Sequence, residues 1–531
     1  MNVMYDIQNI LSSRENWNQH ARSHVIVFLG RYRKAAKETQ KGLITMATVT
    51  TTQEVFEKVS AAQSAYESSR QVSPKKRAEW LDAIARGLGH HADELIEIAQ
   101  KETNLDIARL QGEMKRTIFQ LQLFAKEIQY GPHFEATIDH ADQNWGMGPR
   151  PDIRRVNVPL GVVGVFGASN FPFAFSVMGG DSASALAAGC AVVHKVHDGH
   201  LTLGLRTGEV VVEALKKVGA PEGLFSVIHG RAGAEALVDH PLVQAIGFTG
   251  SLAGGRALFD RASRREKPIP FFGELGSINP VFVTEKAWAT RQNDILTGYA
   301  NAATMGMGQF CTKPGLLFVP QFEVAEIVPV LQKEFSTKKF APLLTPNLRK
   351  GFEASLAQVR ALNNVEVLVE GNNAEAPSPT ILMTTVEAIK ANPEILELEM
   401  FGPASVIVQY QSEKDLTEMV ALLEGQLTCT LQAENDEALG DLIDAIHEKC
   451  GRVLWNGWPT GVTVSYAQHH GGPYPSTTSS AKTSVGTGAI GRFMRAVAYQ
   501  TFPDAMLPPA LQESNPWKII RRVDGRWIEA Q

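Results

Sequence analysis

Residues 158–198 read VPLGVVGVFGASNFPFAFSVMGGDSASALAAGCAVVHKVHD, and this stretch predicts the fold class. The apolar run Val162–Phe166 has the length of a buried strand, and an Ala-rich helical segment at 183–188 follows it. A second apolar strand, Ala191–Val193, comes directly after that helix. Strand, helix and strand in this order are typical of a parallel βαβ unit, so the sequence predicts an α/β protein.

The same alternation extends over most of the chain. Residues 50–130 show the apolar spacing of helices, with Ser73 and Pro74 as a helix start. Further strands and helices alternate at 225–228, at 245–248 and from about 278 to 460. Because parallel sheets bind ligands at the carboxyl ends of their strands, we expect functional residues at those ends.

The composition is that of an ordinary globular enzyme, with 44% hydrophobic and 20% charged residues. A length of 531 residues is enough for two or three domains. The net charge of −5 argues against nucleic acid or an anionic membrane surface as a partner. No segment approaches the roughly 18 apolar residues that cross a membrane. The four cysteines are too scattered for a disulfide framework, which favours a reducing, cytoplasmic setting.

Residues 1–45 are interpreted as an N-terminal extension, because their pattern does not continue into the helices that follow. Met46 precedes a good helix start and could be the true initiator. The extension is then either an upstream artefact or a real but variable, disordered arm.

Three residue types in suitable surroundings are candidates for catalysis. Cys311 lies in Gly308-Gln309-Phe310-Cys311-Thr312, where the glycine allows close approach of backbone and ligand. Glu274, between Gly273 and Leu275, has the flanks of a carboxylate that serves as a general base. Asn170 follows the strand Val162–Phe166, where its amide can donate to a developing oxyanion.

Other residues at strand ends and turns are candidates for binding a dinucleotide. A lysine and an acidic residue after a parallel strand can both reach an adenosine ribose. A glycine-rich turn before a helix can receive a pyrophosphate, although this one is not the G-x-G-x-x-G fingerprint. A glutamate and an aromatic beside a Gly-Pro turn can hold a ribose and brace a flat ring. The candidates are Lys195, Asp198, Gly250, Ser251, Gly255, Glu399 and Phe401, with Arg231 as an alternative ligand of a 2′-phosphate.

These motifs, in this order, resemble the aldehyde dehydrogenase superfamily over roughly residues 50–505. The runs that carry the resemblance are Asn170-Phe171-Pro172, Lys195, Gly250 to Gly255, Glu274-Leu275-Gly276, Gly308 to Cys311, and Glu399 to Pro403. Each match is modest alone, but six in this order make coincidence very improbable.

The resemblance implies a doubly wound cofactor domain, a second α/β catalytic domain and a β-strand arm for oligomerisation. It therefore implies a homodimer or homotetramer. The expected boundaries are 46–135 and 158–273 for NAD(P) binding, 274–465 for catalysis, 136–157 and 480–505 for the arm, and 506–531 for an unplaced C-terminal tail.

The resemblance also implies a mechanism that agrees with the residue chemistry. Cys311 attacks the aldehyde carbon, and Asn170 stabilises the oxyanion. Hydride passes to NAD or NADP, and Glu274 then activates water to hydrolyse the thioester. NAD is favoured over NADP, because the charge of Asp198 should repel a 2′-phosphate.

Several runs resemble one branch of the superfamily, the 2,5-dioxovalerate (α-ketoglutaric semialdehyde) dehydrogenases and an NADP-linked long-chain aldehyde dehydrogenase. They include Glu274 to Pro280 and Asn456 to Val462. The predicted reaction is thus oxidation of α-ketoglutaric semialdehyde to 2-oxoglutarate, with a medium- or long-chain aliphatic aldehyde as the alternative substrate. Candidate pocket residues are Arg116, Gln120, Phe171, Trp458 and Thr460, of which Arg116 would bind a distal carboxylate.

Two rival functions remain. A CoA-acylating semialdehyde dehydrogenase needs no general base, so Glu274 argues against it. A catalytically silent binding or structural member of the fold would not need Asn170, Glu274 and Cys311 together. His90-His91 and His469-His470 are interpreted as structural, and no metal is expected, because no third ligand lies at a suitable spacing.

Overall fold

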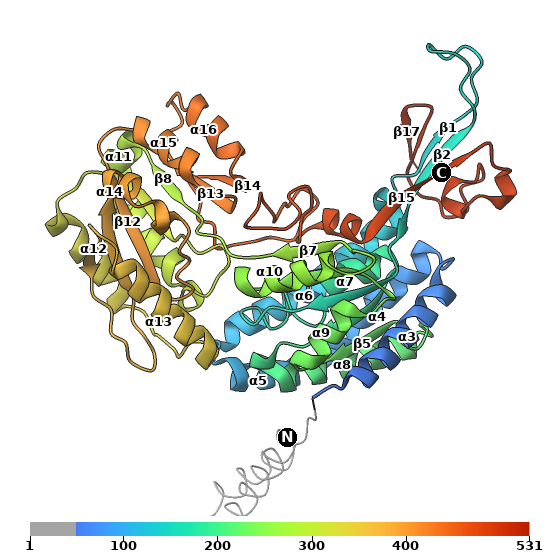
Figure 1. Cartoon of the computed structure of the whole chain (residues 1–531), viewed down its shortest axis with the longest axis horizontal. Helices are drawn as coiled ribbons and strands as arrows, with labels where there is room; N and C mark the ends of the chain where they lie inside the picture. Colours follow the sequence, from blue (N-terminus) through green and yellow to red (C-terminus); the bar gives the residue numbers. More distant parts are fainter. Residues whose placement is uncertain (1–48, 530–531) are drawn as a thin grey trace, which may run out of the picture. The chain divides into compact units, whose positions relative to one another are not determined.

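The computed structural model describes residues 49–529, and Thr50–Gln531 form one compact unit (Figure 1). The N-terminal extension expected over 1–45 lies outside the described residues. No helix within residues 49–529 combines the length and the apolar character that a membrane crossing needs.

The first sheet has five parallel strands in the order β5-β4-β3-β6-β7. From β3 the chain forms β4 and then β5 on one side of β3. It then crosses back and forms β6 and β7 on the other side, so the strand order reverses between β3 and β6. Ligands bind at such switch points in doubly wound sheets. The strands are β3 (Val162–Phe166), β4 (Ala191–Lys195), β5 (Phe225–Ile228), β6 (Val243–Thr249) and β7 (Phe271–Glu274).

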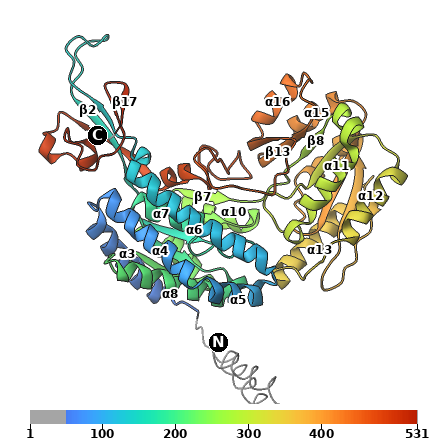
Figure 2. The ribbon, with the colours of Figure 1, turned by 180° about the vertical axis from the view of Figure 1, so that it is seen from behind.

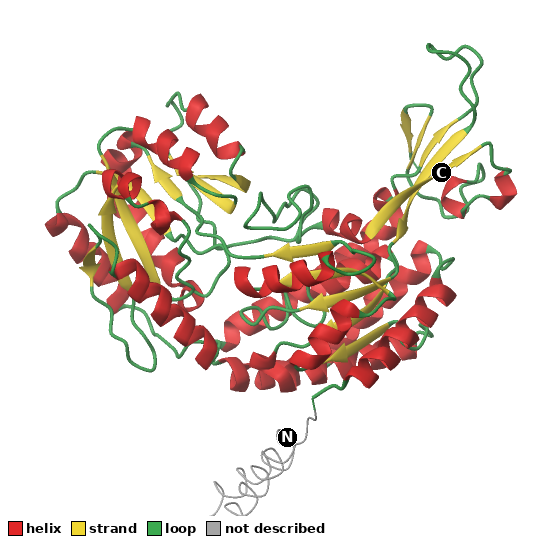
Figure 3. Cartoon of the chain, in the orientation of Figure 1, coloured by secondary structure: helices red, strands yellow, loops and turns green. Residues whose placement is uncertain are grey.

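Helices cover both faces of this sheet (Figure 3). They are α3 (Thr52–Ser69), α4 (Pro74–His90), α5 (Ala92–Thr103), α6 (Ile107–Tyr130), α7 (Gly180–Ala188), α8 (Leu201–Lys217), α9 (Arg231–Asp239) and α10 (Leu252–Ser263). The predicted helix start is confirmed, because the Ser73 side chain caps α4 and Pro74 is its first residue. Figure 2 shows α4 and α6 packed side by side, which fixes the face that α6 turns toward the site.

The second sheet has seven strands in the order β10-β11-β12-β9-β8-β13-β14, and only its edge strand β10 is antiparallel. The strands are β8 (Val281–Val283), β9 (Leu316–Pro320), β10 (Glu366–Val369), β11 (Thr380–Thr385), β12 (Ala404–Tyr410), β13 (Gln426–Gln432) and β14 (Cys450–Trp455). Its helices are α11 (Glu285–Thr304), α12 (Val324–Ser336), α13 (Pro346–Arg360), α14 (Val386–Ala391), α15 (Lys414–Leu422) and α16 (Gly440–His447). Separate apolar cores form on either side of this sheet.

A third sheet in the order β15-β2-β1-β16-β17 projects from the cofactor side of the unit (Figure 1). Its strands are β1 (Thr137–Asp139), β2 (Ile153–Pro159), β15 (Met494–Gln500), β16 (Arg521–Val523) and β17 (Arg526–Ile528). The C-terminal tail that the sequence left unplaced supplies β16 and β17. Of the predicted arm segment 480–505, only β15 belongs to this sheet, so that assignment was too long.

Residues 480–493 lie instead against the first sheet's helices. The 3-10 helix η5 (Thr487–Phe493) packs on α7, and the buried Arg492 guanidinium pairs with the Asp181 carboxylate. Ser484, in the same stretch, donates to the Glu274 carboxylate. The segment therefore supports the candidate site rather than the arm.

Candidate functional site

A cavity of about 920 Å³ opens at the carboxyl ends of the strands of the first sheet. Asn170 follows β3, Asp198 follows β4, and Gly250 with Ser251 follows β6. Residues of the second α/β part complete the lining. The predicted residues that line the cavity are Asn170, Asp198, Gly250, Ser251, Cys311, Glu399 and Phe401. The cavity is large enough for a dinucleotide to reach the thiol from the sheet.

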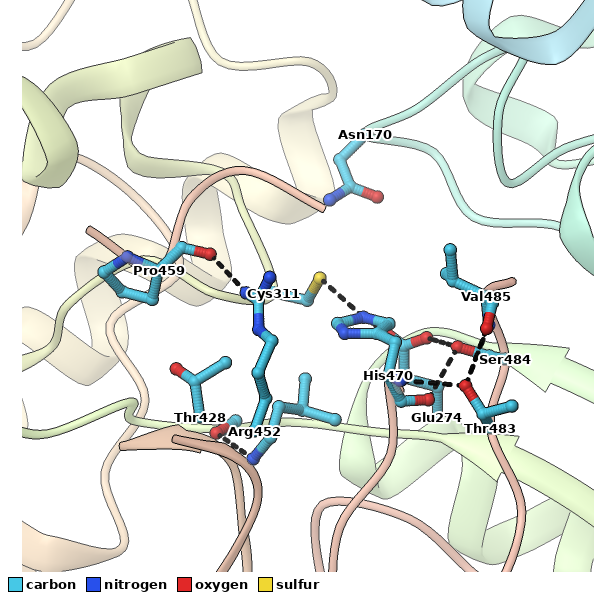
Figure 4. A network of polar contacts seen from close by, with 12 residues as sticks. Asn170, Glu274, Cys311, Thr428, Arg452, Pro459, His470, Thr483, Ser484 and Val485 are labelled. Carbon is cyan, nitrogen blue, oxygen red and sulfur yellow. Dashed lines mark hydrogen bonds and ion pairs between the residues drawn. The ribbon is translucent and has the colours of Figure 1, made fainter. Parts of the chain in front are cut away.

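Cys311 lies just after the 3-10 helix η3 (Met305–Gly308), with its sulfur directed at the imidazole ring of His470 (Figure 4). The distance from Sγ to Nε2 of His470 is 3.7 Å. The Cys311 sulfur, an imidazole nitrogen of His470 and a carboxylate oxygen of Glu274 all lie within 4.8 Å of one another. A carboxylate that can accept the thiol's proton is thus close to the sulfur.

Glu274 is the last residue of β7, and its side chain is almost completely buried. Its Oε1 lies 2.8 Å from Nε2 of His470, and its Oε2 accepts from the Ser484 hydroxyl at 2.8 Å. Burial alone would raise the pKa of Glu274, but the charge and hydrogen bond of His470, with the Ser484 hydroxyl, outweigh burial and lower it. The carboxylate is therefore ionised at neutral pH.

The pKa of the Cys311 thiol is raised well above its ordinary value, first by burial and then by the nearby charge of Glu274. The resting sulfur is consequently a thiol rather than a thiolate. Nucleophilic attack then requires a base close to the sulfur. The ionised Glu274 carboxylate is that base, because Nε2 of His470 carries the proton that it donates to Glu274.

The Asn170 amide spans the gap between the first sheet and the nucleophile. Its Nδ2 donates to the Gln309 carbonyl at 3.0 Å, two residues before Cys311. An amide nitrogen carries two N–H groups, so the second is available to an oxyanion. The Arg109 guanidinium donates to the Asn170 carbonyl at 2.5 Å and lies over the rings of Phe171 and Phe310. Arg109 therefore ties the oxyanion donor to the nucleophile segment.

The unusual run after Glu274 fixes the backbone of the nucleophile. The Nδ2 group of Asn279 donates to the Cys311 carbonyl at 2.8 Å and to the Lys313 carbonyl at 3.0 Å. Its Oδ1 accepts from the hydroxyls of Ser277 and Thr428. Asn279 is fully buried, so this network is shielded from water and rigid.

The adenosine end of the cavity has the predicted lysine and acidic residue. Lys195 Nζ donates to Asp198 Oδ1 at 3.0 Å, and Asp198 itself faces the cavity. Ser251 caps the N-terminus of α10, so unpaired backbone N–H groups and the positive end of the helix dipole point toward the cavity. Gly255 lies within α10, where a Cβ atom would come 2.1 Å from Leu275. Gly255 thus allows close helix packing and makes no contact with the cavity.

The opposite wall of the cavity carries Glu399 and Phe401. Burial raises the pKa of Glu399 to about 7, and the neighbouring Lys313 opposes that rise. Arg231 does not reach this region, because its side chain is 92% exposed and pairs with Glu235 on the surface. Among the described residues that line the cavity, Arg231 is absent.

The five predicted substrate residues lie outside the described cavity lining. Arg116 Nε donates to the Val462 carbonyl at 3.4 Å, and its guanidinium lies over the Phe175 ring. Within residues 49–529, both terminal nitrogens of Arg116 and the buried amide of Gln120 lack hydrogen-bond partners. Phe171 packs between Phe175 and Phe310, Trp458 packs beside Tyr299, and Thr460 is buried.

His470 is the functional candidate that sequence reasoning missed. The sequence interprets the pair His469-His470 as structural, because no third metal ligand lies at a suitable spacing. The partners that the structure gives His470 lie 159 and 196 residues away in the chain. The only local signal is a buried histidine in a segment without strand or helix periodicity, and that signal is weak. Its closeness to the nucleophile follows only from the tertiary fold.

Comparison with known proteins agrees with this geometry. The sequence profile of the aldehyde dehydrogenase family matches residues 31–494, beginning inside the segment interpreted as an extension. Alpha-ketoglutaric semialdehyde dehydrogenase 2 of Azospirillum brasilense is 43% identical over 473 residues, which cover 88% of this chain and 90% of that protein. The alpha-ketoglutaric semialdehyde dehydrogenase of Acinetobacter baylyi is 39% identical over 483 residues, covering 90% and 91%.

Solved structures share the fold at lower identity. The crystal structure of methylmalonate-semialdehyde dehydrogenase from Oceanimonas doudoroffii superposes with a TM-score of 0.72 at 20% identity, covering 86% of this chain and 92% of that chain. An NAD-dependent aldehyde dehydrogenase from Sinorhizobium meliloti superposes with a TM-score of 0.71, covering 85% and 88%. The chain therefore belongs to the aldehyde dehydrogenase family, and it is an oxidoreductase that oxidises an aldehyde with NAD or NADP.

Proposed function

We propose that this protein oxidises α-ketoglutaric semialdehyde to 2-oxoglutarate through a thioester on Cys311. The observation that carries the chemistry is the placement of the Cys311 thiol, the His470 imidazole and the Glu274 carboxylate within 4.8 Å of one another. The names of the two relatives and the unpaired guanidinium nitrogens of Arg116 support the choice of substrate.

In the first half-reaction, the Cys311 sulfur attacks the aldehyde carbon as its proton passes to the nearby Glu274 carboxylate. The N–H at Nε2 of His470 donates to that carboxylate over 2.8 Å and holds it beside the sulfur. The free N–H of Asn170 and a backbone amide near Cys311 receive the oxyanion, and one such donor contributes roughly 3–4 kcal/mol. Ser251 and Glu399 would hold the dinucleotide, which would supply the hydride acceptor.

Glu274 then passes the thiol's proton to solvent. In the second half-reaction, Glu274 takes a proton from water, which attacks the thioester carbonyl carbon, and that proton returns to the released Cys311 sulfur. The lowered pKa of Glu274 keeps it in the basic form for this step. The scheme uses the sulfur, imidazole and carboxylate directly and requires no metal ion.

The ion pair at the adenosine end supports NAD as the preferred cofactor. Asp198 accepts from Lys195 and can accept a ribose 2′-hydroxyl beside it. The negative charge of a 2′-phosphate would lie next to the negative charge of Asp198. Arg231 lies outside the cavity lining, which weakens the alternative that favours NADP.

Arg116 and Gln120 suit the distal carboxylate and oxo group of α-ketoglutaric semialdehyde. The positive charge of Arg116 interacts with the Glu274 carboxylate, which places Arg116 near the Cys311 side of the site. Gln120 lies one turn further along α6. Burying unpaired donors is costly, so a ligand that accepts from them gains affinity. Phe171, Trp458 and Thr460 would form the walls around the carbon chain.

A panel of aldehydes with both cofactors tests this function. We expect the highest kcat/KM with α-ketoglutaric semialdehyde and NAD, a lower value with succinic semialdehyde, and a much lower value with hexanal. Arg116→Met should reduce kcat/KM for the semialdehydes by about 10- to 100-fold and leave hexanal unchanged, because a charge-assisted bond is lost. Hexanal as the best substrate would instead favour the aliphatic alternative, which the ring cluster around Phe171 suits.

We further propose a homodimer or homotetramer assembled through the third sheet. Its outer strands β15 and β17 are edges with unpaired backbone groups, and Trp527 and Ile528 on β17 are exposed. The four cysteines, all within the described residues, are unpaired there, which supports a reducing cytoplasmic setting.

A further inference from the structure

Lys313 lies two residues after the nucleophile, and its side chain is buried. Its Nζ group donates to the carbonyl oxygens of Met400, Gly402 and Ala404, with 3.3 Å to Gly402. All three hydrogens of the ammonium group are therefore used on one backbone turn. A buried ammonium is costly, and three acceptors with one nearby carboxylate offset that cost.

The turn that Lys313 holds is the one that presents Glu399 and Phe401 to the cavity. It also touches the nucleophile segment directly, because a Cβ atom on Gly308 would come 2.1 Å from the Gly402 carbonyl oxygen. The Lys313 carbonyl is held by Asn279, which also holds the Cys311 carbonyl. Lys313 thus connects a rigid backbone at the thiol to the turn opposite it.

The charges of Lys313 and Glu399 depend on each other. Burial lowers the pKa of Lys313 to about 8, and Glu399, the charged group that faces it, opposes that change. Burial likewise raises the pKa of Glu399 to about 7. Glu399 gains its charge as pH rises through its own pKa, and Lys313 loses its charge as pH rises through its higher pKa. Both groups are therefore charged between about pH 7 and about pH 8.

We propose that Lys313 is a positioning residue that locks the Glu399–Ala404 turn against the nucleophile segment and keeps Glu399 ionised for the cofactor ribose. This inference rests on the proposed roles of Cys311 and Glu399. It predicts that cofactor affinity, not thiol reactivity, depends on the ammonium group. The coupling would let an occupied cofactor site stiffen the backbone that carries the sulfur.

The test is direct titration of NAD and NADP by isothermal calorimetry, with no aldehyde present, from about pH 6 to about pH 9. Wild-type affinity should be highest between the two pKa values and fall on both sides. Lys313→Met should bind about tenfold or more weakly at the optimum and should lose the fall on the alkaline side. Alkylation of Cys311 by iodoacetamide should proceed at the wild-type rate in the same variant.

Tyr410→Phe is the matched control. It removes another buried hydrogen bond to a backbone carbonyl, the one that Tyr410 donates to Val283 in the second sheet. It should leave cofactor affinity and its pH profile unchanged. Wild-type affinity and profile in Lys313→Met would overturn the proposal, as would equal loss in Tyr410→Phe. If Lys313→Met does not fold, a flat wild-type profile overturns the proposal and a peaked one supports it. Failure of the aldehyde panel with normal cofactor binding would count against the proposed function alone.

Discussion

At the scale of single residues, Nε2 of His470 contacts both partners of the proposed chemistry. It lies 3.7 Å from the Cys311 sulfur and 2.8 Å from the Glu274 carboxylate. Its Nδ1 is buried without a partner among the described residues, so Nε2 is the nitrogen that makes the ring's polar contacts. The ring therefore keeps the pKa of Glu274 low beside a thiol whose pKa is high, so the carboxylate stays ionised and can take the thiol's proton.

His470→Ala should raise the pKa of Glu274, because burial would then act with less opposition. Below that pKa Glu274 is protonated, so thioester formation should slow by about 100-fold or more, the usual contribution of a positioned base. The basic form of Glu274 is lost as pH falls through its pKa, so hydrolysis should decline at a higher pH than in the wild type. Stopped-flow formation of reduced cofactor, followed over pH, measures both effects. As a control, His469→Ala changes the neighbouring histidine and should leave the rate of thioester formation and the pH dependence of hydrolysis unchanged.

The sequence predicted the residues that lie at ends of strands in the first sheet, because topology alone brings those ends together. Asn170, Asp198 and Ser251 were found in this way, and Cys311 and Glu399 followed from their motifs. His470, Asn279 and Lys313 were not predicted as site residues. Most of their partners lie far away in the chain, so these contacts follow only from the tertiary fold.

At the scale of elements, the 3-10 helix η5 is attached to α7 through the buried ion pair of Arg492 and Asp181. Arg492→Ala leaves the Asp181 carboxylate buried and uncompensated, which typically costs about 3–5 kcal/mol. We expect a loss of that order in urea denaturation. The double variant Asp181→Asn with Arg492→Met should recover much of it, and Lys286→Ala, which breaks an exposed ion pair, should change little. Wild-type stability of Arg492→Ala would contradict a stabilising role of this buried ion pair.

The predicted arm segment 480–505 begins too early, and the sequence pattern could not show where the arm starts. Residues 480–493 are rich in Ser, Thr and Gly and lack both apolar periods, so their burial beside Glu274 leaves no trace in the sequence. The parallel strands were predictable because they are short apolar runs buried on both faces. The strands β16 and β17 are only three residues each and partly exposed, which is too short for a period to register.

At the scale of the whole molecule, the projecting third sheet leaves the apolar side chains of Trp527 and Ile528 on β17 exposed within one chain. Multi-angle light scattering should therefore give the mass of two or four chains. Trp527→Asp combined with Ile528→Asp should lower that mass if β17 is the contact, because charges oppose edge pairing. A monomeric wild type would contradict the proposed assembly.

Aldehyde oxidation is proposed to pass through a thioester on Cys311 that Glu274 helps to hydrolyse. The most direct measurement is one turnover of Glu274→Gln with α-ketoglutaric semialdehyde and NAD, followed by mass spectrometry of the quenched protein. We predict a burst of one reduced cofactor per site, little steady turnover, and an acyl group on the peptide that contains Cys311. Cys311→Ala should bind cofactor and give neither burst nor adduct. Undiminished steady turnover in Glu274→Gln would contradict the role of Glu274 in hydrolysis, and oxidation by Cys311→Ala would contradict the thioester on Cys311.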